Sequence, residues 1–172
     1  YSLMVFESGG RREKELALLD LLEDKTVDGV LFAGVQVDAA LSETMRAKAY
    51  PIVLVTQECS DPDSVMHTVV HDSVAATKDA VQFLIDNGHR RIAFIGGTEQ
   101  DYSNVRKRRL GYGQALGENG LEIPHTYTEY GDFSFASGFA CMRRLYEENT
   151  ELPTAVLACS DTMALGAIRY LK

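Results

Sequence analysis

A short apolar run followed by glycines constrains the fold of this chain more than any other feature. The run, Ile92–Ile95, is too short for a helix and holds no polar residue, which is typical of a buried strand in a parallel sheet. The segment before it, residues 73–87, has helical periodicity and ends at Asn87-Gly88, a dipeptide suited to a left-handed helix terminus. The run continues into Gly96-Gly97. Because ligands of open α/β sheets bind at the carboxyl ends of strands, we expect this loop to line a ligand site.

The rest of the chain alternates apolar runs with amphipathic segments. We predict strands at residues 2–6, 27–33, 52–55, 66–70, 92–95, 126–130 and 154–158. Helices are predicted at residues 12–23, 39–49, 73–87, 104–118, 134–146 and from 161 onward. This alternation indicates parallel sheets with helices on both faces, and we place a division at Gly88, giving two lobes, residues 1–88 and 89–172.

Two of these helices have apolar residues at helical spacing, which we expect to face the core. They are Phe135, Phe139, Met142 and Tyr146 in one helix, and Ala164, Ile168 and Leu171 in the other.

Composition limits the classes of partner. The 172 residues include 17 Lys and Arg against 25 Asp and Glu, a net charge of −8, which argues against this segment gripping a nucleic-acid backbone. The three cysteines, an odd number without paired spacing, indicate free thiols in a reducing compartment, so we expect a cytoplasmic protein. No apolar run approaches the roughly 20 residues that a membrane-spanning helix needs, and we expect no membrane partner.

The usual signatures of catalysis and cofactor binding do not occur in the sequence. It has no P-loop, no dinucleotide fingerprint and no nucleophile elbow. His67 and His71 would lie about 13 Å apart on one face of a strand, with no nearby Cys or Glu pair to complete a metal site, so we interpret them as surface or edge histidines. We therefore expect no cofactor, no metal site and no enzymatic activity, with an α/β enzyme kept as an alternative because carboxylates are plentiful.

A series of short motifs resembles one known family in order and spacing across nearly the whole chain. Chief among them are Val27-Asp28-Gly29-Val30, Pro51-Ile52-Val53, Gly88–Gly96, Arg108–Tyr112, Gly131-Asp132-Phe133-Ser134, Pro153–Val156 and Asp161–Ala167. In these motifs the chain resembles the effector-binding core of the LacI/GalR family of bacterial transcription regulators, itself similar to periplasmic sugar-binding proteins.

The resemblance implies a periplasmic-binding-protein-like fold of type I, with two Rossmann-like lobes and a small molecule between them. It also implies a homodimer in which the effector, sugar-like or nucleobase-like, controls operator binding by a helix-turn-helix outside this chain. Measured against the family, the core is expected to be incomplete at both ends. The alternative is a periplasmic receptor for a sugar transporter, but the unpaired cysteines and Gly88-His89-Arg90-Arg91 favour the regulator.

Two residues stand at family positions that commonly contact the ligand. Arg108 has a planar guanidinium with five donors, suited to hydroxyls, carboxylates or phosphates. The alternative for Arg108 is a surface position on a basic helix. Phe133 offers a flat apolar ring for the face of a sugar or purine, and its alternative is core packing.

Three further residues are weaker candidates for the effector site. Tyr102 and Asn104 follow the central strand, where relatives place polar contacts. Ser160 precedes the last helix, where it could bond a ligand or cap the helix.

Overall fold

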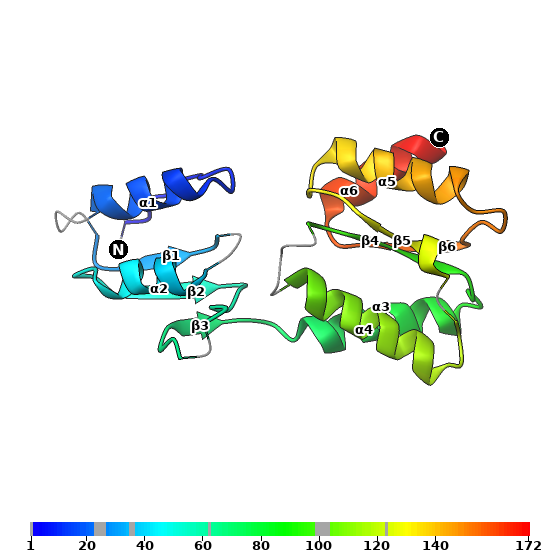
Figure 1. Ribbon diagram of the computed structural model, residues 1–172, viewed down its shortest axis with the longest axis horizontal. Helices are drawn as coiled ribbons and strands as arrows, with labels where there is room; N and C mark the ends of the chain where they lie inside the picture. Colours follow the sequence, from blue (N-terminus) through cyan, green and yellow to red (C-terminus); the bar gives the residue numbers. More distant parts are fainter. Residues whose placement is uncertain (1, 23–26, 35–36, 62, 99–103, 123) are drawn as a thin grey trace. The chain divides into compact units, whose positions relative to one another are not determined.

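The computed structural model describes residues 2–22, 27–34, 37–61, 63–98, 104–122 and 124–172 (Figure 1). The chain forms two compact units, Tyr1–His71 and Asp72–Lys172. Each unit has its own parallel three-stranded sheet and its own hydrophobic core. The expected fold class, two parallel sheets flanked by helices, is confirmed.

The division falls earlier in the chain than the expected boundary at residue 88. Helix α3 (Ser73–Asp86) was placed in the first lobe, but it lies in the second unit. The reason is its contact with helix α4 (Asn104–Glu118), where a Cβ atom on Gly111 would lie 2.3 Å from the main-chain oxygen of Val74. The two helix backbones therefore meet without an intervening side chain.

The sheet of the first unit has the strand order β1-β2-β3. Its strands are β1 (Val30–Phe32), β2 (Ile52–Val55) and β3 (His67–Val69), and its helices are α1 (Arg12–Leu21) and α2 (Ala39–Arg46). Leu19 of α1 and Leu41 of α2 pack in one cluster with Leu54 of β2, so both helices cover the same face. Leu31 and Val69, which point the other way along their strands, are 74% and 63% exposed.

The predicted strand at residues 2–6 is wrong, because the structure has no strand there. Leu3 and Val5 are 85% and 82% exposed, and a groove of about 1030 Å³ lies among residues 2–10, α1 and β1. Within the described part of the chain β1 pairs only with β2. A strand exists only through hydrogen bonds to a neighbour, and local apolar character does not supply one.

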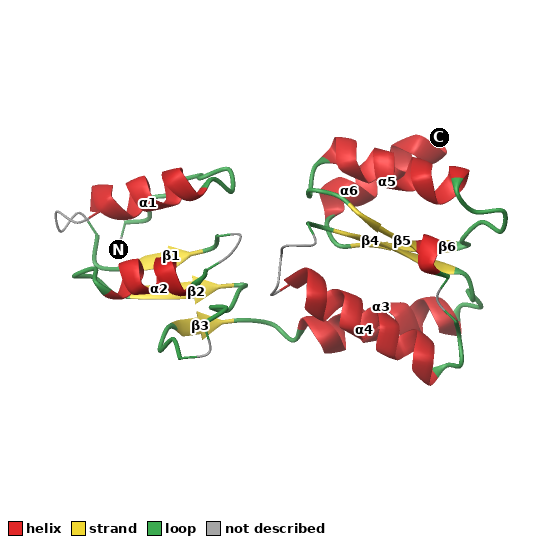
Figure 2. Cartoon of the chain, in the orientation of Figure 1, coloured by secondary structure: helices red, strands yellow, loops and turns green. Residues whose placement is uncertain are grey.

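The second unit has three layers (Figure 2). Its sheet has the order β5-β4-β6, with α3 and α4 on one face and α5 and α6 on the other. The remaining bounds are β4 (Ile92–Gly96), a 3₁₀ turn at His125–Tyr127, β5 (Thr128–Tyr130), α5 (Phe135–Glu147), β6 (Ala155–Ala158) and α6 (Asp161–Leu171). Every residue of β4, the central strand, is buried, as its apolar run predicts.

Helix ends in the second unit follow their sequence signals. Asp72 caps α3 by accepting hydrogen bonds from the amides of Val74 and Ala75, at 3.1 and 3.0 Å. Gly88 and Gly120 follow α3 and α4 with φ values of 88° and 65°, the left-handed backbone that glycine adopts without steric cost. The predicted ends of these two helices are confirmed.

The predicted inner faces of α5 and α6 are only partly right, because the two helices meet through glycines. A Cβ atom on Gly138 would lie 2.2 Å from the oxygen of Met163, and one on Gly166 would lie 2.1 Å from the oxygen of Phe135. Of the residues expected to face the core, Met142 is buried, but four are 44–56% exposed: Phe135, Tyr146, Ile168 and Leu171.

Candidate functional site

The carboxyl ends of β4 and β6 bring several predicted site residues to one edge of the second sheet. The two strands are neighbours in parallel register, from Ile92 opposite Ala155 to Ile95 opposite Ala158. Gly96-Gly97 therefore leaves the sheet beside Cys159-Ser160, and the amide of Cys159 bonds the oxygen of Ile95 at 2.8 Å. Edges of this kind are where open α/β sheets bind ligands.

Phe133 packs directly over the loop that follows β4. A Cβ atom built on Gly97 would lie 2.0 Å from the Cζ atom of the Phe133 ring. Glycine at position 97 is therefore what allows the ring to rest against the backbone. Phe133 is partly buried, which agrees with a ring that has one face covered by the protein.

The backbone of Phe133 is in the left-handed region, with φ of 66°. For a residue with a side chain this conformation costs roughly 1–2 kcal/mol, so the surrounding loop must hold it. The amide of Gly131 donates to the oxygen of Gly96 at 2.9 Å, and that of Ser134 donates to Asp132 Oδ1 at 3.0 Å. Ser137 Oγ in turn accepts from the amide of Asp132 at 3.1 Å. The loop is thus anchored on both sides of the ring.

Asp132 is charged at any physiological pH. Hydrogen bonds from Ser134 and Ser137 lower the pKa of its carboxyl to about 2, below the ordinary value of 3.8. The carboxylate therefore acts as a permanent acceptor for the amide of Ser134, at the start of α5.

Arg108 lies one turn into α4 and reaches the end of β6. Its Nη1 donates a hydrogen bond to the main-chain oxygen of Cys159. Within the described residues this is the contact that Arg108 makes, and the guanidinium carries five N–H donors. The side chain is partly buried. It is therefore held at the sheet edge and not spread over the helix surface, which favours the site interpretation.

Ser160 caps the last helix. Its Oγ accepts a hydrogen bond from the amide of Met163 at 3.2 Å, with Ser160 itself in an extended conformation. The capping role is confirmed, and contact with an effector stays a prediction. Asn104 is the first residue of α4, and Tyr102 lies outside the described residues.

Sequence reasoning missed the polar ties that hold this edge together. Arg108 bonds a main-chain oxygen, that of Cys159, and every residue has one, so the residue types do not indicate this partner. The ion pair between Arg144 and Glu129 joins residues 15 apart in the chain, and nothing local marks either residue.

Two hollows of the described part of the chain lie away from this edge. The groove of about 1030 Å³ is in the first unit, and a second one, of about 340 Å³, lies at the amino end of β4 around Arg90, Arg91 and Glu151. Neither includes Arg108 or Phe133. The groove in the first unit lies between the edge of β1 and the apolar residues 2–6. The candidate site is therefore assigned from the strand ends and the chemistry of the side chains there, and not from the size of a hollow.

In the described part of the chain, no group of three or more His, Cys, Asp or Glu residues is arranged to hold a metal ion. None of the helices there combines the length and the apolar character needed to cross a bilayer.

Comparison with known proteins gives a match over the whole chain. The sequence model of a family described as periplasmic binding proteins and sugar binding domain of LacI family matches residues 1–172. This chain belongs to that family. The resemblance to LacI-type regulators is thereby confirmed.

Curated relatives in the LacI family are transcription regulators. Catabolite control protein A of Priestia megaterium is 36% identical over 168 residues, which cover 98% of this chain and 50% of the relative. The repressor CytR of Escherichia coli K12 is 33% identical over 174 residues, covering 100% of this chain and 49% of the relative. The chain thus spans about half the length of these relatives.

Solved structures of LacI-family regulators share the fold. The structure of the regulator CcpA of Lactococcus lactis superposes with a TM-score of 0.84 at 29% identity, covering 99% of this chain and 61% of that one. The complex of the regulator CelR with cellobiose gives 0.81 at 35% identity, covering 94% and 49%.

Proposed function

We propose that this chain is the effector-sensing core of a LacI-type transcription regulator. In the whole protein, a small molecule binds at the carboxyl edge of the second sheet and changes the affinity of a separate helix-turn-helix for its operator. The protein acts in the cytoplasm as a homodimer, and it does not transform its ligand.

One observation supports this proposal more than any other. Arg108 and Phe133, from different helices and loops, are each fixed by backbone contacts to the strand ends where the family's motifs fall. A guanidinium and an aromatic ring at these strand ends suit a sugar-like or nucleobase-like molecule, through hydroxyl or heteroatom acceptors and an apolar face. We assign Asn104, Ser160 and Tyr102 to the same site as secondary contacts.

The relatives favour a regulator over a transporter receptor. The curated relatives named above are regulators, and CelR was solved with cellobiose. The proposed sugar-like effector rests partly on that likeness. With a net charge of −8, this part of the protein is unsuited to grip DNA itself, which agrees with a separate DNA-binding module.

The mechanism follows from linkage. An effector changes operator affinity only if it binds one conformation of the regulator more tightly than another. The coupling is reciprocal, so operator DNA must change effector affinity by the same factor. A typical coupling of about 1–3 kcal/mol gives a change of roughly 5- to 150-fold in each direction.

The test uses the complete protein. Its operator is selected from random duplexes, and operator affinity is measured by fluorescence anisotropy against a panel of mono- and disaccharides, sugar phosphates and nucleosides. We expect one class of compound to change operator affinity. Calorimetry with and without operator should then give the reciprocal change in affinity for that compound. A complete protein that binds no duplex, or one that turns over a panel compound, would refute the proposal.

A further inference from the structure

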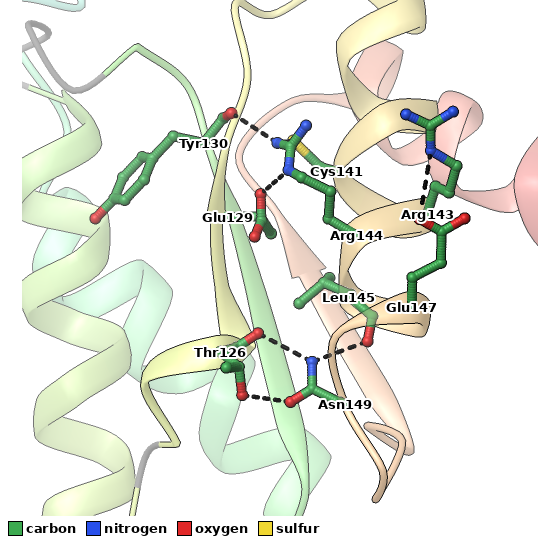
Figure 3. Close-up of polar contacts among 9 residues, drawn as sticks. All are labelled: Thr126, Glu129, Tyr130, Cys141, Arg143, Arg144, Leu145, Glu147 and Asn149. Carbon is green, nitrogen blue, oxygen red and sulfur yellow. Dashed lines mark hydrogen bonds and ion pairs between the residues drawn. The ribbon is translucent and has the colours of Figure 1, made fainter.

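Two sets of polar contacts, here called ties, join α5 and the residues just after it to β5 and the 3₁₀ turn before it (Figure 3). At the carboxyl end of β5, Arg144 pairs with the side chain of Glu129 and donates to the oxygen of Tyr130 at 3.3 Å. In the 3₁₀ turn before β5, the main-chain oxygen of Thr126 accepts from the side-chain Nδ2 of Asn149 at 3.1 Å, and Thr126 Oγ1 donates back to Asn149 Oδ1. The two ties are separate and can be broken one at a time.

The Arg144 tie is partly enclosed. The side chain of Glu129 is 14% exposed and that of Arg144 is 37% exposed, and Arg144 Nη2 also lies 3.2 Å from the sulfur of Cys141. A charge-assisted hydrogen bond in such a position is stronger than a surface pair, and removing one partner leaves a half-buried charge without compensation. Arg143, the preceding residue, makes an exposed pair with Glu147 at 3.9 Å.

The Arg144 tie lies directly before the loop of Phe133. Glu129 and Tyr130 are the last two residues of β5, and Gly131 to Ser134 follow at once. In the described part of the chain, β4 is the strand that pairs with β5. The end of β5 therefore depends on the Arg144 tie as well as on the sheet.

Phe133 needs such an anchor. Its left-handed backbone is unfavourable for a residue with a side chain, and its ring rests on Gly97. If the end of β5 is released, the loop can relax to an ordinary conformation and lift the ring from the glycine.

We propose that Arg144 is a positioning residue for Phe133: by holding Glu129 and the carbonyl of Tyr130, it keeps the ring against Gly97 in the orientation that an effector meets. The role of the ring rests on the function proposed above, but the positioning itself does not need an effector to be observed.

The experiment follows the ring directly. The complete protein is labelled with fluorophenylalanine, and the ¹⁹F signal of position 133 is assigned with Phe133→Leu. The signal is then recorded in Arg144→Ala, in Arg144→Lys, and in two control variants. Arg143→Ala removes the neighbouring arginine of the same helix, and Asn149→Ala removes the tie to Thr126. Thermal melting is measured for each variant.

We expect Arg144→Ala to shift or broaden the Phe133 signal more than either control does. Asn149→Ala should lower the melting temperature but leave the Phe133 signal in place. If Arg144 only stabilised the fold, its loss and the loss of Asn149 would affect the signal alike. Arg144→Lys keeps a positive charge near Glu129, so its Phe133 signal should lie between those of Arg144→Ala and the original protein. This variant also provides the test if Arg144→Ala does not fold.

An unchanged signal in Arg144→Ala, or an equal change in Asn149→Ala, would overturn the proposal. If neither the Arg144→Ala nor the Arg144→Lys protein folds, Arg144 is required for stability itself, and the proposal is likewise overturned. No ligand is added in this experiment. If the complete protein bound no effector, the proposed function would be refuted, but the expected ¹⁹F results would stay the same.

Discussion

The guanidinium of Arg108, on α4, donates a hydrogen bond to the main-chain oxygen of Cys159, the residue that follows β6. This contact joins a helix on one face of the sheet to the strand end from which α6 starts on the other face. It holds a permanent cation at the edge where Phe133 also lies against the backbone.

Replacing Arg108 tests its role as an effector contact. In the complete protein we expect Arg108→Ala to weaken effector binding by more than about tenfold, or roughly 1.4 kcal/mol, because charge-assisted donors are lost. Calorimetry measures the affinity, and circular dichroism checks the fold. Arg109→Ala is the matched control. Arg109 is the next residue of α4, and its Nη1 donates to the hydroxyl of Tyr130 in β5. Equal affinity in Arg108→Ala and the original protein would remove Arg108 from the site.

A methyl group at position 97 tests the seat of the aromatic ring. Gly97→Ala places a Cβ atom 2.0 Å from Phe133 Cζ, so the ring must move. We expect a displaced ring in the crystal structure of the variant and an overpacking cost of about 1–3 kcal/mol in urea unfolding.

Gly117→Ala provides the contrast to Gly97→Ala. Nothing lies within 4 Å of a Cβ atom at Gly117, in α4. The better helix propensity of alanine should raise stability there by up to about 1 kcal/mol. If both alanines had the same effect, the ring would not be seated on Gly97.

The close contact of α5 with α6 gives a third prediction. In Gly138→Ala the new Cβ atom would lie 2.2 Å from the main-chain oxygen of Met163, which a rotamer change cannot relieve. We expect a loss of about 1–3 kcal/mol in the free energy of unfolding. Gly113→Ala, with open space around its Cβ atom, is the control. A Gly138→Ala protein as stable as this control would mean that the helices are further apart.

Tyr112 predicts how stability depends on alkaline pH. Its ring is 1% exposed, its hydroxyl donates to the oxygen of Ile92 at 2.8 Å, and burial raises the pKa of Tyr112 well above the ordinary 10. Above pH 10 the unfolded chain releases this proton while the folded chain keeps it, so the free energy of unfolding falls as pH rises.

The variant Tyr112→Phe separates this titration from the hydrogen bond. We expect it to lower the free energy of unfolding at pH 8 by about 1 kcal/mol, through the lost bond. Its further decline between about pH 10 and 11 should be shallower than in the original chain. Urea unfolding at these pH values measures both effects. Parallel declines in the two proteins would show that Tyr112 does not titrate on unfolding.

Local signals predicted much of the second unit. The bounds of α4, residues 104–118, follow from its periodicity and from the Asn119-Gly120 stop. The run Ile92–Ile95 predicted the buried central strand, which the structure extends by one residue to Gly96. Each of these features depends on residues that are neighbours in sequence.

Features that depend on distant partners could not be predicted in the same way. Residues 2–6 have the composition of a strand, but the structure gives them no strand partner. The inner faces of α5 and α6 include Gly138 and Gly166, so predicting those faces from large apolar residues was only partly right. The boundary at residue 88 failed because α3 packs against α4, whereas periodicity reports only that a helix is amphipathic.

The candidate site shows the same limit. Motifs led to Arg108, Phe133 and Ser160, and the structure brings all three to strand ends of the second sheet. The left-handed backbone of Phe133 and the carbonyl partner of Arg108 have no signature in residue type. Roles in effector binding for these residues, and for Asn104 and Tyr102, stay predictions.

The glycine contact between α5 and α6 has a mechanical consequence. The helices touch in their first turns, directly after Phe133 and Ser160, and there is no side chain between their backbones to yield. A displacement of Arg108 that moves Cys159 and the start of α6 would therefore move α5 as well, because the two helices behave as one rigid unit. Arg108 and Phe133 are therefore mechanically connected through the starts of the two helices, so that a displacement at one is transmitted to the other.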